Sequence, residues 1–457
     1  MLSILLTRLS AIYRKVGFDL DQPIIQLYEY HPQLRILLAI NGQFSNNRNS
    51  LLRFIWPSIC VGMSFTSVGL ELTTISLAIS SRNFSLFTEC FAYFVVIGVV
   101  PILYTCTFKG SKILFKLLDN MDKDFIHMCR LGDPYRTKFL EGQLNIWQFG
   151  FLWMTFVLTV MTSYVILSII ALLHHALLVT QDENSVRPLI FPLWLPEDDV
   201  SRTPNFEIFM FLEYLVIFIF ASNFTAYVYI LFHILLHAYI QMDIVIIAIG
   251  NIFNDIDENV ARLPRTSVEW IETRMELNKR FRSIVTWHNA IFDTVNSTQD
   301  IYGPTLVYQI MFSSVALCLM AFQVAEQLDD GKFDLLFTLL TLGTLIQLWI
   351  PCYIGSLIRT KGFEIADAAF MAGWHDTSLG TMVSSDIRLI IARANKPITF
   401  QVTAIPPLNL ETFSSVRPQL LSSLCILSSK TVKMAQYPVF PVYTSSCLPL
   451  LYIIVYL

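Results

Sequence analysis

Long apolar stretches recur from one end of the chain to the other, separated by shorter polar connectors. One of them, Ile146–Leu173, contains no Asp, Glu, Lys or Arg. An uncharged apolar run of about 18 or more residues predicts a helix that crosses a lipid bilayer. A helix is expected because hydrocarbon offers no partner to the backbone N–H and C=O groups. The pattern therefore excludes most classes of soluble enzyme.

The same pattern predicts six such spans and the beginning of a seventh. The six are Phe54–Ile79, Phe84–Phe108, Ile146–Leu173, Ile208–Leu236, Ile301–Ala325 and Asp334–Ile358, and the seventh begins near Ile398 and covers 398–416 onward. Since the spans are spread along the chain, we expect an all-α fold with residues 1–416 as one polytopic membrane domain. Residues 417–457 would follow as a C-terminal tail.

Basic residues alternate between connectors, and this alternation predicts the orientation in the membrane. Lys and Arg are frequent before the first span, between spans two and three, between spans four and five, and after span six. The connectors Ser80–Asn83, His174–Glu207 and Gln327–Phe333 contain few of them. The N-terminus is therefore expected in the cytoplasm, and seven spans place the C-terminus outside. A G-protein-coupled receptor has the opposite orientation.

Helical spacing continues beyond spans four and five on the predicted cytoplasmic side. Apolar residues run on through His237–Phe253, and Ser267–Ile301 repeats apolar positions at the period of a helix. We expect long cytoplasmic helix extensions that pack on one another. A separate helical hairpin on the surface is the alternative.

Composition agrees with a membrane protein and limits the partners. The chain has 457 residues, of which 54% are hydrophobic and 14% charged, whereas a soluble domain has about 25% charged residues. The net charge of −4 and the absence of a basic cluster predict no nucleic-acid partner. Eight cysteines without a CxxC pair make a disulfide framework a poor interpretation.

No motif of an enzyme or of a cofactor site is present. The chain has no P-loop, no GxSxG and no HExxH, so we expect no catalytic residues, no cofactor and no enzyme. His233 and His237 have the spacing of metal ligands, but no further histidine box accompanies them. Two packed histidines are the favoured interpretation.

The outer halves of spans two, three and four carry aromatic, sulfur and polar side chains at helical spacing. The predicted ligand-binding residues are Tyr93, Phe94, Met161, Tyr164, Ser168, Met210, Glu213 and Tyr214. A mostly apolar pocket with few polar groups suits a small volatile molecule. Glu213, an ionisable residue within a span, would contact a polar or basic ligand group. For any single residue of this set, ordinary helix packing remains the alternative.

Four segments resemble the insect odorant receptor family in the same order along the chain. They are PLIFPLWLPEDDVSRTPNFEIFMFLEYL with Trp194, Pro196, Asp198 and Pro204, TWHNAIFDTVNSTQDIYGPTLVYQI with Trp287-His288, CYIGSLIRTKGFEIADAAFMAGWHD, and IARANKPITFQVTAIPPLNLETFSSV at Ile391–Val416. The order of features matches that family along roughly Met1–Val416.

The resemblance implies a subunit of an odorant-gated cation channel. Members have seven spans with a cytoplasmic N-terminus and assemble as tetramers with a common co-receptor subunit. This chain is similar to the ligand-tuning subunits, because its second cytoplasmic loop is shorter than that of the co-receptor. The implied partners are a small volatile odorant, the co-receptor and membrane lipid. The implied location is the plasma membrane of an olfactory sensory neuron dendrite.

The end of the chain departs from the family. The resemblance implies that the later part of helix seven lines the pore, at Thr412 and Ser415. After Val416 the family continues as an apolar helix, whereas this chain reads RPQLLSSLCILSSK, with Pro418 opposing a helix. We therefore carry over no gate residue. Retention of an intron is a hypothesis for the tail, and sequencing of transcripts across Ser415 tests it.

A second class of function is compatible with the apolar spans. A secondary transporter of small amphipathic solutes is the runner-up. It would need several ionisable residues near the middle of the membrane and broken half-helices, and the sequence does not have that pattern. Substrate flux without a partner subunit would distinguish it from a receptor.

Overall fold

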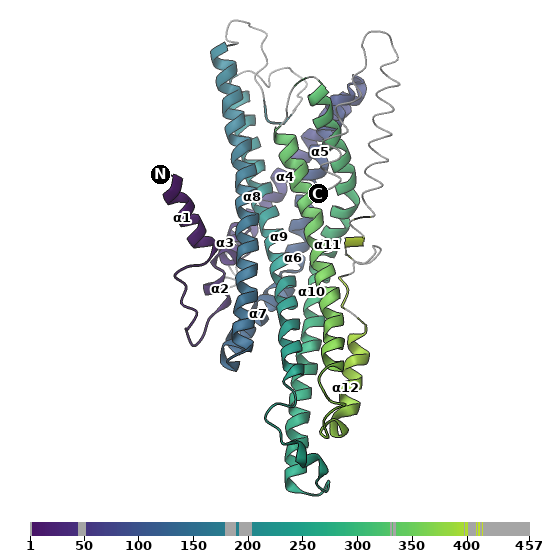
Figure 1. Cartoon of the computed structure of the whole chain (residues 1–457). Coiled ribbons are helices and arrows are strands. Elements are labelled where there is room, and N and C mark those ends of the chain that lie inside the picture. The colour runs from purple at the N-terminus through teal and green to yellow at the C-terminus, as the bar shows by residue number, and fades with distance from the viewer. Residues whose placement is uncertain are drawn as a thin grey trace.

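A bundle of long, steeply inclined helices makes up the protein (Figure 1). The computed structural model describes residues 2–43, 52–178, 189–191, 203–329, 331, 335–396, 398–400, 408, 410, 411 and 414, and the secondary structure within them is entirely helical. The elements are α1 (Leu2–Tyr13), α2 (Leu27–Tyr30), α3 (Pro32–Ile40), α4 (Leu52–Ser80), α5 (Phe84–Ile97), α6 (Val99–Lys109), α7 (Ser111–Leu131), α8 (Tyr135–Leu178), α9 (Asn205–Gly250), the 3₁₀ helix η2 (Glu258–Arg262), α10 (Val268–Asp329), α11 (Leu335–Phe370) and α12 (Gly380–Ala394).

Six segments of the described chain are long and apolar enough to cross a membrane. They comprise α4, the pair α5 and α6, α8, α9, α10 and α11, and each overlaps one of the first six predicted spans. The all-α polytopic fold class is thereby confirmed. Most of the predicted seventh span, both predicted pore residues, Thr412 and Ser415, and the tail 417–457 lie outside the described residues.

The second predicted span, Phe84–Phe108, is interrupted in the structure. It consists of α5 and α6, separated at Gly98. Pro101 explains the break, because proline has no N–H for the carbonyl of Ile97 and its ring clashes with that carbonyl. The Tyr308 hydroxyl donates to the carbonyl oxygen of Val95 at 3.0 Å, just before the break. A side chain on Gly98 would meet that hydroxyl at 3.0 Å.

Helices α9 and α10 continue without interruption beyond any bilayer. They contain 46 and 62 residues, and at about 1.5 Å per residue both exceed a hydrocarbon core of about 30 Å. They meet at the narrow end of the bundle, beside α12 (Figure 1). We call this predicted cytoplasmic end the inner end, and the end where α4 meets α5 the outer end. The expected helix extensions are therefore continuous with the spans, and are not a separate surface hairpin.

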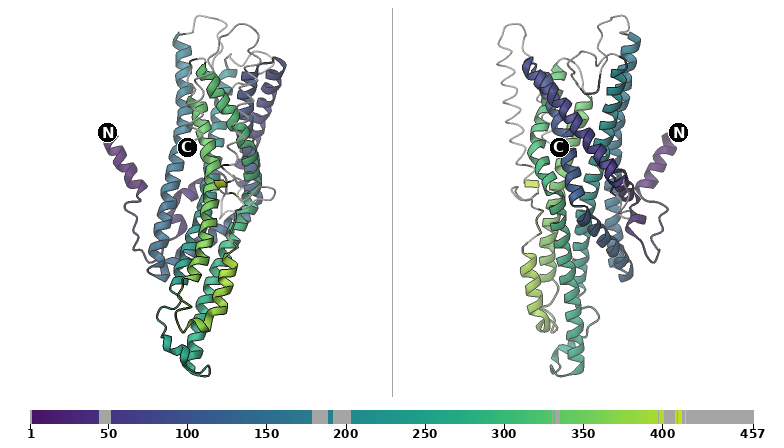
Figure 2. Two further views of the ribbon diagram at one scale, coloured as in Figure 1. Left: turned by 45° about the vertical axis from the view of Figure 1, so that its right-hand side comes forward. Right: turned by 180° about the vertical axis from the view of Figure 1, so that it is seen from behind.

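Short helices that the apolar pattern did not predict pack around the inner end. Helix α7 is amphipathic and buries Leu114, Leu118, Met121 and Phe125. Helices α2 and α3 lie against α7 and α9, whereas α1 projects away from the bundle (Figure 2). Helix α4 runs obliquely across the bundle in the view from behind (Figure 2).

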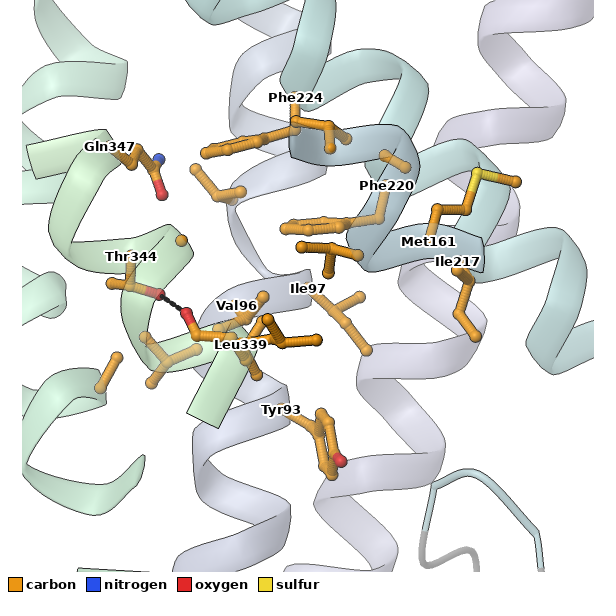
Figure 3. Close-up of a pocket in the computed structure, with 18 of the residues that line it drawn as sticks. Tyr93, Val96, Ile97, Met161, Ile217, Phe220, Phe224, Leu339, Thr344 and Gln347 are labelled. Carbon is orange, nitrogen blue, oxygen red and sulfur yellow. Dashed lines mark hydrogen bonds between the residues drawn. The ribbon is translucent and has the colours of Figure 1, made fainter. Parts of the chain in front are cut away.

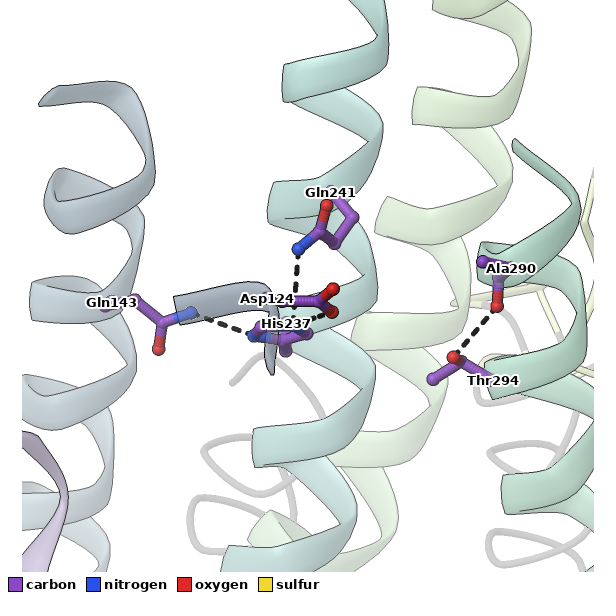
Figure 4. A network of polar contacts seen from close by, with 6 residues as sticks. All are labelled: Asp124, Gln143, His237, Gln241, Ala290 and Thr294. Atoms are coloured by element: carbon purple, nitrogen blue, oxygen red, sulfur yellow. Dashed lines mark hydrogen bonds and ion pairs between the residues drawn. The ribbon is translucent and has the colours of Figure 1, made fainter. Parts of the chain in front are cut away.

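A chain of buried polar contacts ties these inner elements together (Figure 4). The Gln143 amide on α8 lies 3.1 Å from His31 Nε2 and 3.0 Å from His237 Nδ1. His237 Nε2 lies 3.1 Å from a carboxylate oxygen of Asp124 on α7. Since Gln143 donates to Nδ1, His237 carries its proton on Nε2 and donates it to Asp124. One network therefore joins α7, α8, α9 and the N-terminal segment.

Candidate functional site

An internal cavity lies among α5, α8, α9, α10 and α11, between the middle of the bundle and its outer end (Figure 3). Its volume is about 130 Å³, and its lining is almost entirely apolar. A dry apolar cavity of about 150 Å³ binds a benzene-sized guest. The space therefore suits a small apolar molecule with about one ring.

Three of the predicted ligand-binding residues line this cavity, and five do not. Tyr93, Met161 and Tyr164 are among the lining residues, and Figure 3 labels the first two. The five outside the lining are Phe94, Ser168, Met210, Glu213 and Tyr214. The Ser168 hydroxyl lies 3.0 Å from the Tyr214 hydroxyl, so these two satisfy each other. Ligand contact by members of the set remains a prediction.

Glu213 has a role at the cavity that sequence alone did not indicate. Its carboxylate accepts hydrogen bonds from the backbone N–H of Ile190 at 2.9 Å and of Phe191 at 3.2 Å. The Phe191 ring lines the cavity and packs edge-on against Tyr93, with ring centroids 4.9 Å apart. Glu213 is buried, and its contacts are to the backbone of a connector. It therefore positions a lining residue without lining the cavity itself.

The inner part of the cavity was missed by the sequence analysis. Aromatic residues one or two turns deeper than the predicted set line it, namely Trp153, Phe156, Phe220 and Phe224. Polar side chains also reach it from α10 and α11, namely Gln309, Ser313, Thr344 and Gln347. Glutamine within an apolar span is a usable signal, because an amide in hydrocarbon needs a partner. Gln309 and Gln347 could have been found by that argument.

Most of these inner polar side chains form hydrogen bonds within the protein. The Gln309 amide accepts from the Tyr227 hydroxyl at 3.0 Å and donates to the backbone oxygen of Gln347 at 2.9 Å. The Thr344 hydroxyl donates to the backbone oxygen of Leu340 at 2.9 Å (Figure 3). Ser313 donates to the backbone oxygen of Gln309. These groups stabilise the wall and leave little capacity for a ligand.

The histidines do not form a metal centre in the described part of the chain. No group of three or more His, Cys, Asp or Glu residues there could hold a metal ion. His237 is engaged by Gln143 and Asp124, and the His233 ring packs against that of His31, with centroids 4.3 Å apart.

Comparison with known proteins gives consistent matches. The family model described as 7tm Odorant receptor matches residues 97–417. The chain is 30% identical to Odorant receptor 47b of Drosophila melanogaster over 141 residues, which cover 30% of this chain and 34% of that protein. It is 23% identical to Odorant receptor 67c of the same species over 133 residues, which cover 29% of this chain and 32% of that protein. The alignments thus span about one third of these curated relatives.

Solved structures share the fold over nearly the whole chain. The insect olfactory receptor OR5 from Machilis hrabei is similar with a TM-score of 0.59 and 16% identity, covering 88% of this chain and 98% of that one. The same receptor in complex with eugenol gives a TM-score of 0.65 at the same identity and coverage. At this identity the likeness shows the fold.

Proposed function

Because the chain belongs to the 7tm odorant receptor family, we propose that it is an odorant receptor subunit whose cavity binds small apolar molecules. The observation that carries the proposal is the apolar cavity lined by α5 and α8–α11 (Figure 3). The related Machilis hrabei receptor has been solved in complex with eugenol, a single-ring compound. Both observations support binding of a ligand inside the membrane-spanning bundle.

The proposed mechanism is a shift between two packings of the bundle. A ligand that fits one packing better moves the equilibrium toward it. Helix α11 transmits this change in packing, because it lines the cavity at Thr344 and continues to Gly355 and Ser356. A side chain on Gly355 would strike the backbone oxygen of Leu408 at 2.0 Å. The Ser356 hydroxyl accepts from the backbone N–H of Leu410 at 2.9 Å. Helix α11 thereby links the cavity to Leu408 and Leu410, in the middle of the predicted seventh span.

The proposal also includes the gating of a cation current by the ligand. The chain would assemble with a co-receptor subunit in the plasma membrane of a sensory neuron, where ligand binding opens a shared pore. Co-expression with that subunit should give odour-evoked cation current from a form that has a family-like seventh helix. If the tail after Val416 occurs in the mature protein, we expect that form to bind ligand and to conduct no current.

Ligand binding tests the proposal without depending on the pore. The full chain in lipid nanodiscs should gain thermal stability in the presence of single-ring volatiles, eugenol among them. Replacing Ala316, a buried lining residue on α10, by Leu should abolish the gain because the larger side chain fills the cavity. As a control, Leu158→Phe on the exposed face of α8 should leave the gain unchanged. No gain with any compound, or an equal gain in Ala316→Leu, would refute the proposal.

A further inference from the structure

Gln347 lines the cavity, and its polar side chain has no partner among the described residues. Its backbone oxygen accepts the bond from Gln309, which fixes α11 against α10 at this level. Its side-chain amide makes no hydrogen bond with the described residues, and it extends from α11 toward the Phe224 ring (Figure 3). The amides of Gln309 and Gln347 line the same wall, yet only that of Gln309 is used by the protein.

A second polar group without a partner lies in the wall of the cavity, on the lining residue Trp153. The indole N–H of Trp153 is buried and has no hydrogen-bond partner, although the Trp153 ring packs against that of Phe224 at a centroid distance of 5.7 Å. A buried N–H without a partner is rare in folded proteins and calls for an explanation. Indole can only donate a hydrogen bond, whereas an amide can both donate and accept. Because the Trp153 N–H is closed off from the cavity space, the Gln347 amide is the group that a ligand oxygen can reach.

From this amide, and resting on the function proposed above, we propose that Gln347 is the specificity-determining contact of the cavity. It selects apolar molecules of about one ring that carry a single carbonyl or ether oxygen. The oxygen lies at the inner end, where it accepts from the Gln347 amide, and the ring lies toward Tyr93 and Met161. A hydrocarbon of the same shape leaves this amide without a partner. A site built to bond an oxygen rejects the analogue that lacks it.

Two compounds of nearly identical shape make the test direct. Acetophenone and α-methylstyrene differ in having C=O or C=CH₂ beside the ring. Their dissociation constants are measured from ligand-dependent melting of the full chain in nanodiscs, with empty nanodiscs correcting for partition into lipid. The wild-type chain should bind acetophenone more tightly by up to about tenfold, since one net hydrogen bond contributes up to about 1.5 kcal/mol.

Variants separate the role of Gln347 from a general effect on packing. Gln347→Met keeps the length of the side chain and removes the amide, so the preference for acetophenone should fall to about threefold or less as one bond is lost. Thr344→Val is the matched control on the same helix, because its hydroxyl is already bonded to Leu340. It should retain the full preference.

The possible outcomes separate the role of Gln347 from the proposed function. Equal binding of the two compounds by the wild-type chain, or an unchanged preference in Gln347→Met, overturns the role of Gln347 while the cavity remains a ligand site. Failure of the wild-type chain to bind either compound, or any other single-ring volatile, overturns the proposed function itself. If Gln347→Met does not fold, the wild-type ratio alone still decides the class of ligand.

Discussion

The inner and outer halves of this bundle use similar residues in opposite ways. At the inner end, the Gln143 amide bridges two histidines on different elements, and Gly150 lets α8 approach Tyr229 on α9 closely. In the outer half, the Gln347 amide has no partner among the described residues, and Gly343 has only ordinary contact with Phe156. The inner half therefore holds the structure together, whereas the outer half keeps space and an amide without a partner for a ligand.

Removing one glutamine from each half should give the largest contrast. Gln143→Leu leaves His31 and His237 without their amide partner, and each buried orphan costs about 1–3 kcal/mol. Gln347→Leu breaks no side-chain bond to the described residues, so its stability should stay close to that of the wild type. Thermal melting in nanodiscs measures both. A melting temperature that falls equally in the two variants would remove the distinction between the halves.

Adding one methyl group to each half should give the next largest contrast. In Gly150→Ala the new Cβ would lie 2.4 Å from Tyr229 Cε2, and overpacking of this kind costs about 1–3 kcal/mol. In Gly343→Ala the nearest atom is 3.7 Å away, so the substitution should be tolerated. Surface expression and melting temperature check the pair. Normal folding of Gly150→Ala would mean that α8 and α9 pack less closely than described.

Acid should destabilise the inner half. Burial, followed by the neighbouring His233, holds the pKa of His31 well below its usual range. The unfolded chain takes up a proton on His31 near pH 6.5 while the folded chain does not, so stability falls as the pH drops below that value. The loss for one such group is at most about 1.4 kcal/mol per pH unit.

The acid effect can be assigned by substitution. His31→Gln should reduce the fall in melting temperature between pH 6.5 and pH 5. This range begins at the ordinary pKa of histidine, about 6.5. An unchanged decline in His31→Gln would show that another group causes the acid effect.

The smallest effect is expected at Glu213, which holds the outer connector through Ile190 and Phe191. Glu213→Gln keeps the shape of the side chain but can accept only one of the two bonds from Ile190 and Phe191. The looser Phe191 ring should speed ligand release by about two- to tenfold, as one net hydrogen bond predicts. Release of acetophenone after rapid dilution measures it. Ser168→Ala, which removes a nearby bond to Tyr214, should not change the rate.

The apolar pattern was sufficient for the long helices but not for the details of packing. Spans of this length leave few alternatives to a helix, and the extensions of α9 and α10 repeat the same period. The break at Gly98 could have been placed from Pro101. Helices α7 and α12 are amphipathic or short and have no span-like signal, so they were not predicted.

Only part of the cavity could be found from sequence, because its lining depends on how five helices turn toward one another. Tyr93, Met161 and Tyr164 were predicted and line it, since they share one level of the outer half. Trp153 and Phe224 lie deeper and were missed. The function of Glu213 depends on a tertiary contact to Ile190 and Phe191 that no local spacing encodes.

The most direct test of the account is an electron cryomicroscopy map of the chain saturated with acetophenone, alone or with its partner subunit. We expect density for one ring among α5, α8, α9, α10 and α11, with the carbonyl oxygen within hydrogen-bond distance of Gln347. Ligand density elsewhere in the bundle, with this cavity empty or closed at saturation, would contradict the account.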